Sequence, residues 1–246
     1  EADDIFNYSM DNISDMDLHY KFNTGNGSIV YDHSGNRNHG NIHGASWACI
    51  KDLCGVCSGD NSTCTLISDI DGNSYGTVEI GNQSWMRQNL KTTNYSNGDA
   101  VPTGLNNGDW MDTSDGAYAV YNDEESNSEL YGNLYNWYAA SDSRGLCPEG
   151  WQMPTYENYL ELIDYLDNSD AGGKLKSTGT FESGDGLWLD PNSGATNDSG
   201  FSGLPGGTKG GGSGNYGGNL NHQGHYWAGD SENDNEARAL ILTYIN

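Results

Sequence analysis

The chain has 246 residues, which is enough for one large domain and a smaller segment. It carries 35 Asp and Glu against 10 Lys and Arg, and the formal net charge of -25 repels phosphate backbones and anionic lipid surfaces. Since the sequence also lacks a run of about 18 apolar residues, we expect neither nucleic-acid binding nor membrane insertion.

Aromatic and turn-forming residues together indicate the kind of fold. The 16 Tyr, 7 Trp and 4 Phe provide large apolar surfaces that a disordered chain usually lacks. The 35 Gly, with abundant Asn, Asp and Ser, favour tight turns because they adopt positive φ or cap turns locally. The composition therefore predicts a folded protein with short strands and long ordered loops.

Residues 1–48 are predicted to form an N-terminal β segment. Residues 1–17 are acidic and polar, and we interpret them as an extension or linker. Residues 18–23 alternate apolar and polar side chains, residues 27–32 do so less cleanly, and residues 34–40 are rich in turn formers. These patterns are typical of edge or sandwich strands.

Four of the five cysteines, Cys49, Cys54, Cys57 and Cys64, lie within residues 49–64. Four cysteines allow three pairings, and the sequence does not choose among them. The spacing of Cys54 and Cys57 also suits zinc, but no second Cys-x-x-Cys follows. We therefore predict a disulfide-linked connector and an oxidising location, outside the cell or on its surface.

The remainder of the chain carries signals for a hairpin, two short helices and a final strand. Turn residues flank alternating apolar positions in residues 69–86, which predicts a β-hairpin. Apolar residues three or four apart predict helices over residues 131–140 and 155–166, the second with Thr155 as N-cap. Residues 237–244 are predicted to form a strand.

Two glycine-rich stretches also carry predictions. Gly172 and Gly173 are expected to stop the pattern that follows the second helix. Residues 203–214 have the composition of a flexible linker, but Phe201 and Tyr216 bracket them. We therefore predict a loop anchored within a domain.

Six motifs occur in order between about residues 66 and 246, and their succession resembles the Fibrobacter succinogenes major paralogous domain. The motifs are Asp69-Ile-Asp-Gly-Asn-x-Tyr75 with Val78-x-Ile80-Gly81; Tyr131-Gly-x-Leu-Tyr-x-Trp137; Cys147-Pro-x-Gly-Trp-x-Met-Pro-Thr155; Ala171-Gly-Gly-Lys-Leu-Lys176; Asn197-x-Ser-Gly-Phe-Ser-x-Leu-Pro-Gly-Gly207; and Tyr226-Trp227. The resemblance implies an α+β fold of C-type-lectin-like type over residues 65–246, with two short helices, small antiparallel sheets and long loops.

The resemblance also implies that this domain lacks its last strand. The family usually continues, after a strand like residues 239–244, into further strands that end in a Val-Arg-Cys type segment. On this comparison Cys147 lacks the cysteine that it would normally meet. We expect a strand from outside this sequence to complete the domain, because an open sheet edge is a template for strand addition.

The N-terminal residues carry two further resemblances. Residues 20–23, 32–40 and 43–45 resemble the opening of laminin-G-like or concanavalin-like domains, and residues 49–64 resemble extracellular connectors written CGVCxGDNSxC. About 45 residues cannot close a sandwich core alone, so these strands need a partner in the C-terminal domain or in another copy. Copies joined head to tail would form a filament, and the alternative is a fragment of a longer chain.

The sequence shows no motif that indicates catalysis. The six His show no motif spacing, and His222 and His225 are expected in a glycine-rich loop. The resemblance implies a likeness to formylglycine-generating enzymes, but those use a reactive cysteine pair and the matching region here holds only Cys147. We therefore expect no enzyme activity and no catalytic residues.

Calcium is a more serious candidate than catalysis, because the sequence offers oxygen ligands for it. Asp69, Asp71 and Asn73 carry hard oxygen ligands, as does the acidic stretch of residues 230–236. The first group also suits an ordinary hairpin turn, which is the reading that we favour.

The sequence offers candidate residues both for binding glycans and for carrying them as modifications. Trp188 and Trp227 are candidates for stacking against sugars, although most Trp side chains pack in the core. Asn-x-Ser/Thr sequons begin at Asn7, Asn12, Asn26, Asn61, Asn82, Asn94 and Asn197. We expect a non-enzymatic extracellular structural or adhesive glycoprotein, with other copies of itself as partners; the alternative is a carbohydrate-binding module.

Overall fold

The computed structural model describes residues 29–30, 40–41, 51–210, 212–233 and 236–245. The chain divides into two compact units, Glu1–Ile50 and Lys51–Asn246. In the first unit, β1 (Ile29–Val30) pairs antiparallel with β2 (Gly40–Asn41). The strand expected over residues 18–23 lies outside the described residues.

The second unit contains the predicted hairpin, which is confirmed and extended by one strand. The strands β3 (Leu66–Ser68), β4 (Ser74–Ile80) and β5 (Gln83–Met86) form an antiparallel sheet in the order β3-β4-β5. The turn between β4 and β5 is two residues long, and Gly81 adopts a φ of 62° that favours glycine. This sheet leaves β3 and β5 as edges.

Five short α-helices, one 3-10 turn and a two-stranded ladder follow in the described residues: α1 (Asn107–Asp112), β6 (Tyr118–Ala119), the 3-10 turn η1 (Tyr121–Asp123), α2 (Glu125–Tyr131), β7 (Leu134–Tyr135), α3 (Trp137–Ala140), α4 (Tyr156–Tyr165) and α5 (Ala171–Leu175). The prediction of α4 is confirmed. Thr155 caps its first turn in a reciprocal pair with Asn158, which satisfies two orphan backbone groups.

Two predictions about helices are wrong. The helix expected over residues 131–140 is divided into the last residue of α2, strand β7 and the single turn α3. Gly172 and Gly173 do not stop the pattern but lie inside α5. A Cβ atom on Gly173 would approach the carbonyl oxygen of Gly194 to 2.1 Å, so this glycine permits a close backbone approach.

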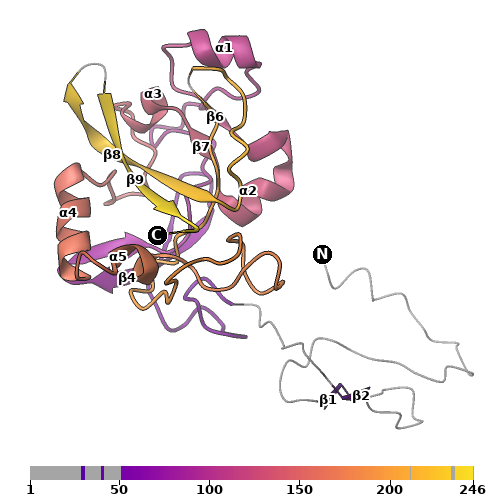
Figure 1. Cartoon of the computed structure of the whole chain (residues 1–246). Helices are drawn as coiled ribbons and strands as arrows, with labels where there is room; N and C mark the ends of the chain where they lie inside the picture. The colour runs from indigo at the N-terminus through magenta and orange to yellow at the C-terminus, as the bar shows by residue number, and fades with distance from the viewer. Residues whose placement is uncertain (1–28, 31–39, 42–50, 211, 234–235, 246) are drawn as a thin grey trace, which may run out of the picture. The chain divides into compact units, whose positions relative to one another are not determined.

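The chain ends in a long antiparallel ladder of β8 (Gln223–Asn233) and β9 (Glu236–Thr243). The strand β9 confirms the prediction for residues 237–244, whereas His225 lies in β8 and not in a loop. Helix α4 packs against both strands and against α5 (Figure 1). Together they enclose the main core, whose fully buried members include Leu162, Leu175 and Trp188.

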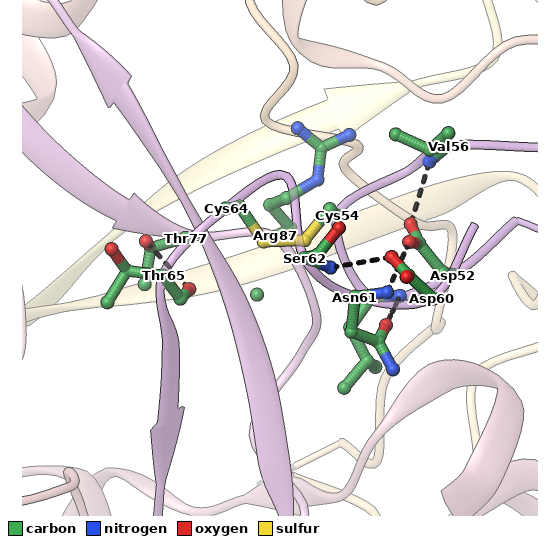
Figure 2. The surroundings of a disulfide bond; sticks show 12 residues. Asp52, Cys54, Val56, Asp60, Asn61, Ser62, Cys64, Thr65, Thr77 and Arg87 are labelled. Carbon is green, nitrogen blue, oxygen red and sulfur yellow. Dashed lines mark hydrogen bonds between the residues drawn. A yellow bond between two sulfur atoms is a disulfide. The ribbon is translucent and has the colours of Figure 1, made fainter.

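The cysteine-rich connector packs on the β3-β4-β5 sheet through specific bonds. Cys54 and Cys64 form a disulfide, and Figure 2 shows it beside Arg87. The Gln88 side chain donates to the carbonyl of Leu53 and accepts from the backbone N–H of Gly76, so it ties the connector to β4. Cys57 is also disulfide-bonded, and Cys49 lies outside the described residues.

The described fold is α+β with short helices and small antiparallel sheets, as expected. Within the described ranges, none of the helices has the length and apolar character needed to span a bilayer.

Candidate binding groove

A groove of about 1260 Å³ lies in the C-terminal unit. It is larger than the roughly 300–1,000 Å³ of ordinary small-molecule pockets. Strand β5, the segment around β7 and α3, and both long strands β8 and β9 contribute to its walls. Residues 146–147, 150–154, 203–204 and 206–210 complete it from loops. Its size therefore suits a segment of a polymer.

The lining is aromatic. Five of the seven Trp residues of the chain line the groove: Trp85, Trp110, Trp137, Trp151 and Trp227. The rings of Trp137 and Trp227 meet edge to face at 5.7 Å between centroids. Aromatic side chains dominate recognition surfaces because each buries a large apolar area.

The charge of the lining differs from that of the chain. No Asp or Glu is found among the described residues that line the groove, although the chain has 35 of them. Arg87 and Lys209 do line it. The groove is therefore a neutral to cationic surface on a strongly anionic protein, and it disfavours a basic occupant.

The free Cys147 lies in this lining and is partly buried. Burial raises the pKa of its thiol to about 11. Sulfur nucleophiles act as thiolates, so this thiol is protonated and unreactive at neutral pH.

The sequence-based candidates for sugar contact separate into two environments. Trp227 lines the groove, and its indole N–H donates to the carbonyl of Tyr135 at 2.9 Å. Trp188 is fully buried, and its indole N–H donates to Ser177 Oγ and to the carbonyl of Gly203. This burial removes Trp188 from the candidate ligand surface.

Sequence reasoning missed most of the aromatic residues that line the groove, among them Trp137 and Trp151. Trp137 and Trp151 are only partly buried, and no described residue accepts a hydrogen bond from either indole N–H. Both stand in the motifs that carry the family resemblance, and this position is the sequence signal that could have pointed to them.

The candidate calcium ligands Asp69, Asp71 and Asn73 lie together in the turn between β3 and β4. One oxygen of Asp69 accepts from the backbone N–H groups of Asp71 and Asn73, and the other accepts from the Asn73 amide and from the hydroxyl of Tyr75 at 2.6 Å. These carboxylate oxygens act as acceptors within the turn. In the ranges that the structure describes, no group of three or more His, Cys, Asp or Glu is arranged to hold a metal.

Asp71 joins this turn to a neighbouring segment, and we expect its contribution to stability to depend on pH. Burial raises the pKa of Asp71, but hydrogen bonds from Thr93, Asn94 and Thr92 outweigh burial and lower it below 3.8. A carboxylate whose pKa is lower in the folded state stabilises the fold above its unfolded pKa. This contribution is lost as the pH falls through the folded pKa.

The measurement is the free energy of unfolding in urea between pH 2 and pH 7, for the wild type and for Asp71→Asn. Because Asp71 is exposed and its hydrogen bonds compete with water, we expect the variant to be less stable by only about 0.5–1 kcal/mol at pH 7 and to lose less stability on acidification. Parallel curves for the two proteins would contradict the role given to this carboxylate.

The seven sequons differ in how available their amides are. Asn7, Asn12 and Asn26 lie outside the described residues. The side-chain amides of Asn94 and Asn197 donate to Asp71 and Ser202, bonds that an attached glycan would disrupt. Asn61 is partly buried and accepts from the backbone N–H of Leu53. Asn82 is exposed in the β4–β5 turn, so it is the most accessible described sequon.

Comparisons with known proteins place the chain in a family. The family described as the Fibrobacter succinogenes major domain matches residues 78–245, which is more than half of the chain. No curated protein and no solved structure matches the chain, so the C-type-lectin-like assignment stays a prediction. The chain belongs to the Fibrobacter succinogenes major domain family.

Proposed function

We propose that this protein is a non-enzymatic, extracellular structural or adhesive protein whose copies assemble into a filament, each accepting a strand from a neighbour. The observation that carries the proposal is the groove, which is aromatic, has no carboxylate among its described lining residues and is larger than a small-molecule site. Exposed apolar surfaces of this kind mark places where macromolecules associate.

The disulfide and the charge support an extracellular location. The bond between Cys54 and Cys64 is of a kind that persists in oxidising surroundings. A net charge of -25 keeps the dispersed protein soluble until a specific contact overcomes repulsion.

The titratable groups of the groove support a role without catalysis. The Cys147 thiol is protonated at neutral pH because burial raises its pKa to about 11. Burial also lowers the pKa of His225, and no carboxylate among the described lining residues is available to orient that imidazole as a base. A nucleophile paired with an activating base is therefore not assembled among these residues.

The test is a charge placed on the groove wall. Ile241 lies on β9, lines the groove and is 51% exposed, so Ile241→Asp leaves the core intact. We expect the purified wild-type chain to form filaments in negative-stain images. We expect Ile241→Asp to stay dispersed because burying a carboxylate against an apolar partner is costly. Sedimentation velocity measures the fraction assembled.

The matched control is Leu130→Asp in α2. Leu130 is 52% exposed and does not line the groove. Its replacement by Asp therefore adds the same charge at a similar exposure outside the groove. This variant is expected to assemble like the wild type. A wild-type chain that remains a dispersed monomer at all concentrations would overturn the proposal.

The alternative is a carbohydrate-binding module, and the unpartnered indole N–H groups of Trp137 and Trp151 favour it. Such groups, beside exposed aromatic faces, are suited to sugar hydroxyls. Polysaccharide pull-down that is lost in a folded Trp151→Ala variant, without any self-assembly of the wild type, would support this alternative over the filament.

A further inference from the structure

We propose that the strand accepted from a second copy adds to the outer edge of β5, where it becomes the fourth strand of the β3-β4-β5 sheet. This inference rests on the proposed self-assembly and adds the place, the backbone groups and the chemistry of the incoming segment. Strand addition to a sheet edge uses main-chain hydrogen bonds for affinity and side-chain pockets for selectivity.

The register of the ladder identifies the free groups of β5. Arg87 N–H donates to the carbonyl of Gly76 at 2.9 Å, and Val78 lies opposite Trp85. In an antiparallel ladder, hydrogen-bonded pairs alternate with non-hydrogen-bonded pairs, so the peptide groups of Ser84 and Met86 point away from β4.

The outward groups have no partner within the described parts of the chain. The N–H and C=O groups of Ser84 and Met86 form no hydrogen bond to another described residue outside the β4–β5 ladder. An edge of this kind is a template for pairing with another strand.

The pattern of lining residues shows that this edge faces the groove. All four residues of β5, Gln83–Met86, line it in succession, as expected when a strand presents its edge. On β9 every second residue lines it, namely Ala237, Ala239 and Ile241, which means that β9 presents a face. An added strand would therefore hydrogen-bond to β5 and pack on β9.

The same lining defines the chemistry of the occupant. Toward β9 it meets the small and apolar side chains of Ala237, Ala239 and Ile241, so an extended segment with apolar residues at alternate positions fits. Arg87 and Lys209 complement the carboxylates that flank segments of this acidic chain. A second copy of the chain satisfies both requirements, and a basic peptide does not.

A proline in the edge strand tests the inference without breaking the existing sheet. Ser84→Pro removes the outward N–H, and β4 does not use that group, so proline is tolerated as it is on natural edge strands. The matched control is Ser68→Pro on β3, the opposite edge. Asp69 N–H donates to Asn73 O, so the same alternation turns the Ser68 peptide groups outward. Each substitution also removes one exposed hydrogen bond of the serine hydroxyl, so the two variants are matched in this respect.

The full chain is made without N-glycans, because Ser84 belongs to the sequon at Asn82. Sedimentation velocity then measures association of the wild type and of both variants. We expect Ser84→Pro to weaken association by roughly tenfold to a hundredfold and Ser68→Pro to leave it unchanged. Hydrogen exchange is expected to slow at the Ser84 and Met86 amides of the assembled wild type.

The possible failures are distinguishable. If Ser84→Pro associates as strongly as the wild type, and the Ser84 and Met86 amides of the assembled wild type still exchange fast, strand addition at β5 is wrong. Self-assembly as such would then still stand. A wild type that does not associate overturns self-assembly and this inference together. Circular dichroism of each variant verifies that the sheet is retained.

Discussion

Replacing Trp188 by Ala is expected to lower the free energy of unfolding by about 3–5 kcal/mol. The side chain is fully buried within the cluster that joins α4, α5 and the β8–β9 ladder, so its removal leaves a large cavity. The substitution also removes the indole N–H, which donates to Ser177 Oγ and to the Gly203 carbonyl, both at 3.1 Å. Urea unfolding followed by far-ultraviolet circular dichroism measures the loss.

The matched control for this prediction is Phe181→Ala. Phe181 lies in the same loop region, and its backbone N–H donates to the carbonyl of Trp188, but its ring is 63% exposed. Its truncation is expected to change stability by no more than about 0.5 kcal/mol. Equal losses for the two variants would show that Trp188 does not occupy the core as described.

Replacing Asp69 by Ala is expected to destabilise the fold by about 3 kcal/mol. This carboxylate is 7% exposed and accepts four hydrogen bonds, from two backbone N–H groups, the Asn73 amide and the buried hydroxyl of Tyr75. Alanine leaves those donors without an acceptor in a site that water reaches poorly. Thermal and urea unfolding both measure the effect.

The control is Asp112→Ala at the end of α1. Asp112 is exposed and caps no turn, so its removal is expected to leave the free energy of unfolding within about 0.5 kcal/mol of the wild type. Calcium provides a second check. If Asp69 served mainly as a metal ligand, millimolar Ca²⁺ would raise the stability of the wild type markedly and that of Asp69→Ala not at all.

Local sequence signals determined several elements of this protein. The hairpin was predictable because turn residues and alternating apolar positions lie next to each other in the chain, and α4 because Thr155 provides its cap locally. The apolar residues 237–244 predicted β9 for the same reason. The order of the motifs was enough to indicate the family that the comparison then showed.

The tertiary structure decided what depends on contacts between distant residues. Strand β8 carries Gly, His and Asp positions that read as a loop, and it forms because β9 pairs with it along its length. Position 173 of α5 requires glycine because the backbone of Gly194 lies against it, and no local pattern indicates that proximity.

The groove likewise needed the tertiary structure. Its walls join residues from Gln83 to Ile241, and the sequence alone did not distinguish Trp227, which lines it, from Trp188, which the core encloses. Local sequence fixes where hydrogen-bonded elements begin and end, because caps and turns act over a few residues. Whether a side chain is buried or open to a partner depends on the packing of elements far apart in the chain, and only the folded structure determines it.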